Sequence, residues 1–127
     1  MAKRKKEATE SLHKCIIDAI LDKKGNGVVS LDLSKLPNAV CQNFIICHAD
    51  SSNQVSAIAE NIEEQVESEL GEKVWQRGGY ENSIWVVLDY VDVVVHVFQT
   101  EWREFYRLEE LWADAKRTNY STNENKN

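Results

Sequence analysis

Apolar residues repeat at helical spacing in two separate segments of the chain. Within residues 11–24 they fall on one face of a predicted amphipathic helix. Within residues 55–70 they do so again, and glutamates occupy the opposite face. Ser51 and Gln54 have the spacing of a capping box at the start of this second helix, and Gly71 suits the position just after its last turn. The pattern therefore predicts two amphipathic helices, each with one face turned toward a core.

Short runs of β-branched and aromatic residues predict strands between and after these helices. Five strands are expected, at residues 28–33, 43–48, 73–76, 84–89 and 93–98. The last strand contains VVVHVF, which is apolar at almost every position and typical of a strand covered on both faces. The tight connection between the last two strands predicts an antiparallel hairpin. Thr100 is expected to cap a final helix that is rich in aromatic residues.

The order of these elements, α-β-β-α-β-β-β-α, cannot produce a purely parallel sheet. It predicts one α/β (α+β) domain in which helices flank a mixed five-stranded sheet, with a parallel pair joined through the helix of residues 50–72. A chain of 127 residues suits a single core. The domain is expected at residues 10–114, between a disordered basic tail at 1–9 and a disordered polar tail at 115–127.

Charge is unevenly distributed along the chain. The net charge is −6, and four basic residues lie at positions 3–6, so the remainder of the chain is near −10 (−6 minus 4). An acidic domain without a basic stripe is a poor candidate for sequence-specific nucleic-acid binding and suits a basic protein partner, although acidic charge also simply maintains solubility. The sequence shows neither a membrane-spanning apolar stretch nor a secretory signal, which indicates a cytoplasmic protein.

Candidate catalytic and metal-binding residues are sparse. The three cysteines lack a CxxC spacing and are expected to be reduced thiols in or beside apolar segments, and no metal or cofactor site is predicted. Asp89 and Asp92 could bind Mg²⁺ for nucleotidyl transfer, but no glycine-rich phosphate loop accompanies them, and aspartates that accept backbone N–H bonds in a turn fit better. Cys47 and His48 are adjacent on a strand, so their side chains are expected on opposite faces.

Aromatic residues are concentrated in the second half of the chain. Trp85 and Trp112 are predicted to be core residues, whereas Tyr80 and Tyr90 are candidates for a surface that binds a protein partner.

The segment DYVDVVVHVFQTEWREFYRLEELWADA, residues 89–115, resembles the closing block of the ribosomal silencing factor family, RsfS or Iojap. LDLS at residues 31–34 and FIICHADSSNQVSAIAENIEE at residues 44–64 resemble earlier parts of the family pattern, so the resemblance covers about residues 10–114. It implies a nucleotidyltransferase-like fold without a catalytic loop. It also implies a non-enzymatic translational repressor that binds ribosomal protein L-fourteen of the large subunit and sterically blocks joining of the small subunit.

The resemblance also implies which residues contact the ribosomal protein. They are Tyr80, Trp85, Asp89, Tyr90, Asp92, His96, Phe98, Arg103 and Tyr106.

The chain departs from the family pattern at four places. Cys41-Gln42 replaces a Thr-Asp pair, His48-Ala49-Asp50 replaces a Thr-Gly-Thr/Ser loop, and Gly78 replaces an acidic residue. Val91 replaces the hairpin glycine, and because β-branched residues tolerate positive φ poorly, this turn is expected to keep a negative φ.

Three alternatives remain open at the level of sequence. A metal-dependent nucleotidyltransferase would use Asp89 and Asp92. A large-subunit maturation factor would bind the ribosome without affecting subunit joining. A homodimer formed through an exposed strand edge and an apolar patch could accompany any of these functions.

Overall fold

The computed structural model describes residues 6–37, 39 and 41–120. Its elements are α1 (Lys6–Asp22), β1 (Asn26–Asp32), β2 (Asn43–Ala49), α2 (Ser52–Leu70), β3 (Gln76–Gly78), β4 (Trp85–Asp89), β5 (Val93–Gln99), α3 (Thr100–Tyr106), α4 (Leu108–Leu111) and β6 (Lys116–Asn119). The strands form one sheet in the order β3-β4-β5-β2-β1-β6. Strands β2 and β5 are parallel, and every other neighbouring pair is antiparallel. The predicted mixed sheet flanked by helices is therefore confirmed, with six strands rather than five.

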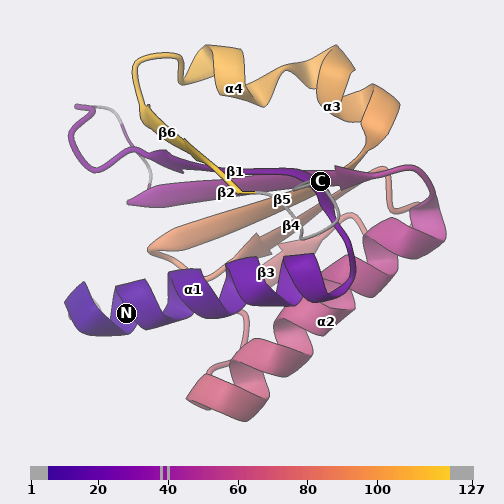
Figure 1. The fold of residues 1–127 in the computed structure, drawn as a ribbon, viewed down its shortest axis with the longest axis horizontal. Helices are drawn as coiled ribbons and strands as arrows, with labels where there is room; N and C mark the ends of the chain where they lie inside the picture. The colour runs from indigo at the N-terminus through magenta and orange to yellow at the C-terminus, as the bar shows by residue number, and fades with distance from the viewer. Residues whose placement is uncertain (1–5, 38, 40, 121–127) are drawn as a thin grey trace, which may run out of the picture.

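The sheet lies between two layers of helix (Figure 1). Helices α1 and α2 lie side by side on one face, and the short helices α3 and α4 cover the other. Strand β5 serves both layers, because Val95 and Val97 belong to the core under α1 and α2, while Val94 and Phe98 belong to the core under α3 and α4. This arrangement confirms the prediction that the VVVHVF strand is covered on both faces. Among the described residues, no helix is long and apolar enough to cross a membrane.

Helix α2 begins and ends where the sequence predicted. The Ser51 hydroxyl accepts a hydrogen bond of 3.1 Å from the backbone N–H of Gln54, and Gly71 adopts a left-handed conformation at φ 67° after the last turn. The predicted cap of α3 is wrong. Gln99 occupies the cap position without a side-chain bond, and the Thr100 hydroxyl instead donates to the Asp50 carboxylate at 2.6 Å.

The β4–β5 hairpin has a positive φ at Val91, contrary to the prediction that this turn keeps a negative φ. Val91 has φ 77°, and the Asp92 N–H donates to the carbonyl of Tyr90 two residues earlier at 3.0 Å. Those two features define a tight γ-turn. The Asp89 carboxylate accepts from the Val91 N–H at 2.8 Å, so hydrogen bonds on both sides of Val91 compensate for its unfavourable backbone conformation.

The predicted boundaries are wrong at three places. Helix α1 starts at Lys6, so the predicted tail at 1–9 is too long, and residues 1–5 lie outside the described residues. Strand β3 lies at 76–78 rather than 73–76.

The third error is the predicted disordered tail after residue 114. Residues 116–119 form strand β6, which pairs with β1, and the Tyr120 hydroxyl lies 3.2 Å from the Ser30 hydroxyl. Residues 121–127 lie outside the described residues.

Candidate partner-binding surface

Aromatic rings from β4 and α3 form a continuous cluster that reaches solvent. Trp85 stacks on Phe98 with ring centroids 4.8 Å apart. The ring centroid of Tyr106 also lies 4.8 Å from that of Trp85. Phe105 contacts both Tyr106 and Trp102. We call Trp85, Trp102, Phe105 and Tyr106 the aromatic surface. Phe98 is not included, because it is fully buried beneath them.

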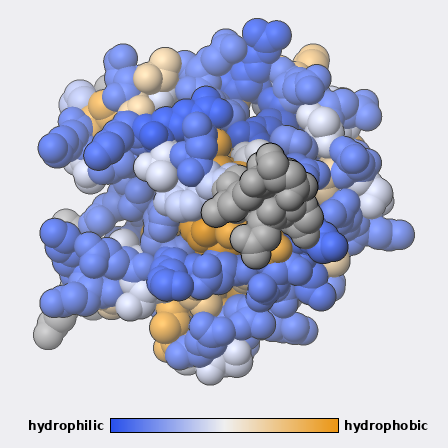
Figure 2. Space-filling view, in the orientation of Figure 1, coloured by the Kyte–Doolittle hydropathy of each residue, from blue (hydrophilic) through white to orange (hydrophobic). Residues whose placement is uncertain are grey.

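Exposure makes this surface a candidate for binding another protein. Phe105 is 70% exposed and Tyr106 is 44% exposed, whereas Trp85 and Trp102 are partly buried against the core. The side of the molecule seen in Figure 2 is mostly hydrophilic, with apolar residues in small patches. Aromatic side chains with part of their area accessible provide much of the binding energy at protein interfaces. Glu101 and Glu104 are exposed on α3 as well, so the surroundings of the aromatic surface include negative charge.

Two buried residues of the predicted site support this surface from beneath. His96 is 6% exposed, and its Nδ1 accepts a hydrogen bond of 3.0 Å from the Trp85 indole N–H. The proton of the neutral ring is therefore on Nε2, a buried atom without a hydrogen-bond partner among the described residues. Burial lowers the pKa of His96 to about 4, so the ring is neutral at pH 7. With Phe98, His96 orients Trp85 and is not itself accessible to a partner.

The remaining predicted contacts do not gather at one place. Tyr80 packs against the core under α1 and α2, on the opposite side of the sheet from Trp85, and its hydroxyl donates to the Glu63 carboxylate at 2.6 Å. Tyr90 belongs to that same core and is 1% exposed, so the prediction that it forms part of an accessible surface is wrong for this conformation. The predicted core positions of Trp85 and Trp112 are confirmed, although both are only partly buried.

The two aspartates of the hairpin, Asp89 and Asp92, are part of the turn and its buried surroundings. Asp89 accepts a backbone N–H in the turn, as predicted, and Asp92 is 6% exposed. Within the described ranges, no group of three or more His, Cys, Asp or Glu side chains could hold a metal ion. Burial also raises the pKa of the Cys47 thiol to about 12, which keeps it protonated and unreactive. The described residues thus offer no assembled set of groups for metal-dependent transfer.

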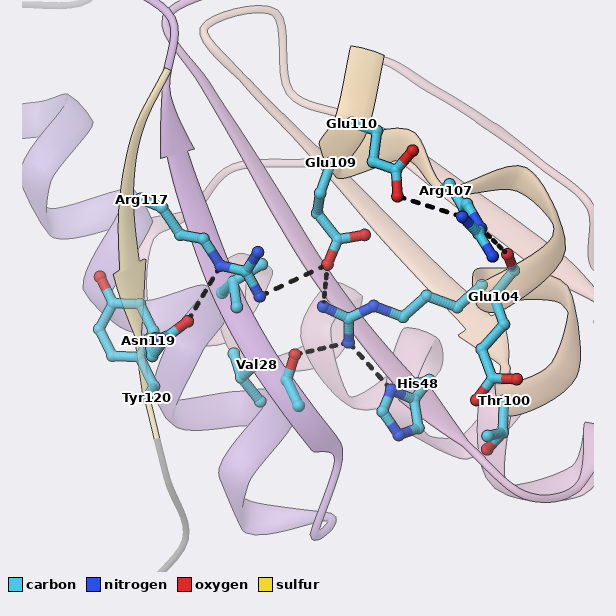
Figure 3. A pocket seen from close by; sticks show the side chains of 13 residues that line it. Val28, His48, Thr100, Glu104, Arg107, Glu109, Glu110, Arg117, Asn119 and Tyr120 are labelled. Atoms are coloured by element: carbon cyan, nitrogen blue, oxygen red, sulfur yellow. Dashed lines mark hydrogen bonds and ion pairs between the residues drawn. The ribbon is translucent and has the colours of Figure 1, made fainter. Parts of the chain in front are cut away.

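Arg103 lines a cavity of about 690 Å³ beside α3. Figure 3 shows that His48 of β2, Glu109 of α4 and Arg117 of β6 surround the same cavity. The Arg103 guanidinium donates to the carbonyl of Gly27 at 2.6 Å, contacts Nδ1 of His48 at 2.9 Å, and pairs with Glu109 at 2.5 Å. Its side chain is only 10% exposed. Arg103, which the resemblance implied as a partner contact, is therefore engaged with its own chain. His48 faces this cavity while Cys47 lies in the opposite core, which confirms the prediction that they point apart.

Sequence reasoning missed the most exposed apolar residues. Phe105 and Leu111 are 70% and 75% exposed on the two helices that follow β5, and Trp75 is 54% exposed before β3. Phe105 and Tyr106 lie three and four residues after Trp102 in a helix of seven residues, and this concentration of aromatic residues was the available signal.

Comparisons with known proteins decide the family. The family model described as "Ribosomal silencing factor during starvation" matches residues 5–127. The chain belongs to the ribosomal silencing factor family. It is 39% identical to the ribosomal silencing factor RsfS of Halalkalibacterium halodurans over 108 residues, which cover 85% of this chain and 91% of that protein. It is also 37% identical to the chloroplastic protein Iojap of Zea mays over 75 residues, which cover 57% of this chain and 31% of that protein.

A solved structure agrees with this assignment. A crystal structure of a protein from Chromobacterium violaceum superposes with a TM-score of 0.77 at 36% identity, covering 82% of this chain and 85% of the other. The resemblance seen in the sequence is thus confirmed for both family and fold. Membership in the ribosomal silencing factor family supports a ribosome-associated role in translational silencing, in a family named for regulation and not for a reaction.

Proposed function

We propose that this chain silences translation by binding ribosomal protein L-fourteen of the large subunit and sterically blocking the small subunit from joining. The proposed action is stoichiometric and requires neither catalysis nor a cofactor, and the proposed location is the cytoplasm. The observation that carries the proposal is the exposed aromatic surface on a chain of the ribosomal silencing factor family.

The aromatic surface fits a basic ribosomal partner in two ways. Phe105 and Tyr106 have ring faces that attract Lys and Arg side chains. Trp85, which is a residue of the sheet, packs against Tyr106 and fixes its position. Glu101 and Glu104 add negative charge on the same helix. Complementary charge accelerates the encounter, while buried aromatic contacts slow dissociation.

The predicted contact residues divide accordingly. We propose direct contact for Trp85 and Tyr106, with Phe105 added to them. Tyr80 and Asp89 are partly exposed and remain candidates for contacts at a second region of the surface. Because Tyr90, Asp92, His96 and Phe98 are buried, we assign them a supporting role in the fold.

Sedimentation with purified large subunits tests this proposal. Wild-type chain should co-sediment with large subunits and reduce the yield of joined ribosomes when small subunits are added. Phe105→Ala and Tyr106→Ala should each weaken binding to isolated L-fourteen by about tenfold or more, which corresponds to a loss of about 1.4 kcal/mol or more in binding free energy. Trp75→Ala is a matched control, because Trp75 is an exposed aromatic residue outside the aromatic surface.

Each other outcome has a distinct meaning. Binding without any effect on joining would replace silencing by a role in large-subunit maturation. Unchanged binding in both Phe105→Ala and Tyr106→Ala would reject the aromatic surface as the contact. Light scattering over a concentration series would show whether a homodimer forms, and loss of that dimer in Phe105→Ala would mean that self-association and ribosome binding compete for one surface.

A further inference from the structure

Helix α3, which carries most of the aromatic surface, is too short to be stable alone. It has seven residues, none of them fully buried, and α4 after it has only four. Isolated helices of this length are unstable in water, because the cost of nucleation exceeds what a few hydrogen bonds return. Partial packing of Trp102 and burial of Leu108 hold one side of the segment. The position of α3 must therefore depend on further contacts to the sheet.

Arg103 provides those contacts at the centre of α3. Its guanidinium reaches the Gly27 carbonyl on β1, the His48 ring on β2 and the Glu109 carboxylate on α4 (Figure 3). We call this group the Arg103 clamp. Gly27 is part of its geometry, because a Cβ at that position would lie 2.7 Å from the Arg103 Nη1 atom and 2.7 Å from the His48 ring.

Charge pairing gives the clamp its strength. Burial would raise the pKa of the Glu109 carboxyl, but the hydrogen bond and positive charge of Arg103 outweigh it, and the pKa lies below its ordinary value. A guanidinium that is 90% buried would be strongly unfavourable without such partners. Arg103 and Glu109 therefore hold each other in place, and with them α3 and α4.

We propose that Arg103 is a positioning residue for the partner-binding surface: it ties α3 to the sheet so that Tyr106 stays against Trp85. Arg103 touches the partner nowhere in this scheme. Without the Arg103 side chain, α3 and α4 can separate locally from the sheet. The partner must then order this segment before it binds, which costs free energy and weakens binding. This inference rests on the proposed function for its binding consequence.

The clamp has a pH signature through His48. Its Nδ1 accepts a hydrogen bond from Arg103 only when the ring is neutral, and a protonated ring would repel the guanidinium. Four charged groups face His48: Arg103 and Glu104 from α3, Glu109 from α4 and Asp50 from the loop after β2. Burial and Arg103 together outweigh the three carboxylates and hold the pKa of His48 below 6.5. Because the clamped state has the lower pKa, the clamp is complete above pH 6.5 and weakens as the pH falls below that value.

Hydrogen exchange and affinity for L-fourteen, measured on the same variants, test the proposal. Arg103→Met keeps the aliphatic part of the side chain and should raise amide exchange across residues 100–111 by about tenfold, with α1 and α2 unchanged. It should also weaken binding to L-fourteen, because the apparent affinity falls with the fraction of molecules in which α3 is closed on the sheet. Arg103→Lys should recover part of each effect. Arg107→Met is the control, since it removes the same charge from an exposed side chain and should change neither measurement.

A comparison of the wild type with His48→Asn covers the case in which Arg103→Met fails to fold. His48→Asn retains an oxygen acceptor near the position of Nδ1 but cannot be protonated. Wild-type affinity should fall between pH 7 and pH 5.5 relative to His48→Asn, a ratio that cancels titration of the partner. A constant ratio would overturn the role of His48 in the clamp.

The remaining results separate the two proposals. Weaker binding by Arg103→Met without faster exchange would make Arg103 a direct contact and overturn the positioning role. Faster exchange with unchanged affinity would overturn it as well. If the wild type does not bind L-fourteen, the proposed function and this extension both fail, while exchange in Arg103→Met still decides whether the clamp holds α3.

Discussion

Replacing His96 by phenylalanine isolates the contribution of one buried ring to the pH dependence of stability. In the folded chain His96 is neutral, accepts a hydrogen bond from Trp85, and lies edge-on to Phe44 with ring centroids 4.7 Å apart. A charged ring in this apolar setting would lose its hydration and would no longer accept from Trp85. The folded state therefore resists protonation of His96, whereas the unfolded chain does not.

The size of the effect follows from the pKa of His96. Burial lowers it from 6.5 to about 4, and each unit corresponds to about 1.4 kcal/mol, so the neutral ring contributes about 3 kcal/mol at neutral pH. Because the folded pKa is the lower one, this contribution is complete above pH 6.5 and is lost as the pH falls toward 4. By the same linkage relation, about 2 kcal/mol should already be lost at pH 5.

Urea unfolding of the wild type and His96→Phe, followed by circular dichroism from pH 7.5 to pH 4.5, measures this loss. Between pH 7 and pH 5, the free energy of unfolding of the wild type should fall by about 2 kcal/mol relative to that of His96→Phe. Packing changes caused by phenylalanine are the same at every pH and cancel from that comparison. Parallel pH profiles for the two proteins would refute the buried neutral ring as the source of the effect.

Three further substitutions address backbone geometry, and urea unfolding at pH 7 measures each of them. Val91→Gly should raise the free energy of unfolding by about 1 kcal/mol, because it relieves a β-branched residue at φ 77°; a loss would show that the hairpin tolerates valine without strain. Ser51→Ala should lower it by about 1 kcal/mol through loss of the α2 cap, and no change would mean that water replaces the hydroxyl. Gly27→Ala should lower it by about 2 kcal/mol, because its Cβ collides with Arg103 and its φ is positive; wild-type stability would show that the clamp moves aside freely.

The fold was largely predictable because its main elements follow strong local patterns. Helix α2 has a clear apolar face with a cap at each end, and β5 is apolar at nearly every position. Strand β6 could not be predicted in the same way. Its residues KRTN are all exposed, and it is a strand because its backbone pairs with β1, whose residues precede it by 84 to 90 positions, as 116 − 32 and 119 − 29 show. Such pairing leaves little trace in the local sequence.

The candidate site was less predictable, because it depends on contacts between distant elements and on one unusual turn. Tyr90 follows β4 directly and lies two residues after Leu88, so it continues the face of β4 whose side chains belong to the core under α1 and α2. Val91 itself adopts a conformation that its side chain disfavours, since hydrogen bonds from neighbouring residues override the intrinsic preference. Arg103 looked like a surface residue because its acceptors come from β1, β2 and α4.

The pairing of β6 with β1 also affects how the chain reaches its folded state during synthesis. Strand β1 is made early, yet its outer edge pairs with residues 116–119, which are made after every other element of the sheet. Until then, β1 presents unpaired N–H and C=O groups, the feature that makes edge strands prone to aggregate. Contacts between residues so distant in sequence also form slowly. The short polar strand therefore protects the edge of β1 only after residues 116–119 have been made, and its two basic residues then discourage pairing with other chains.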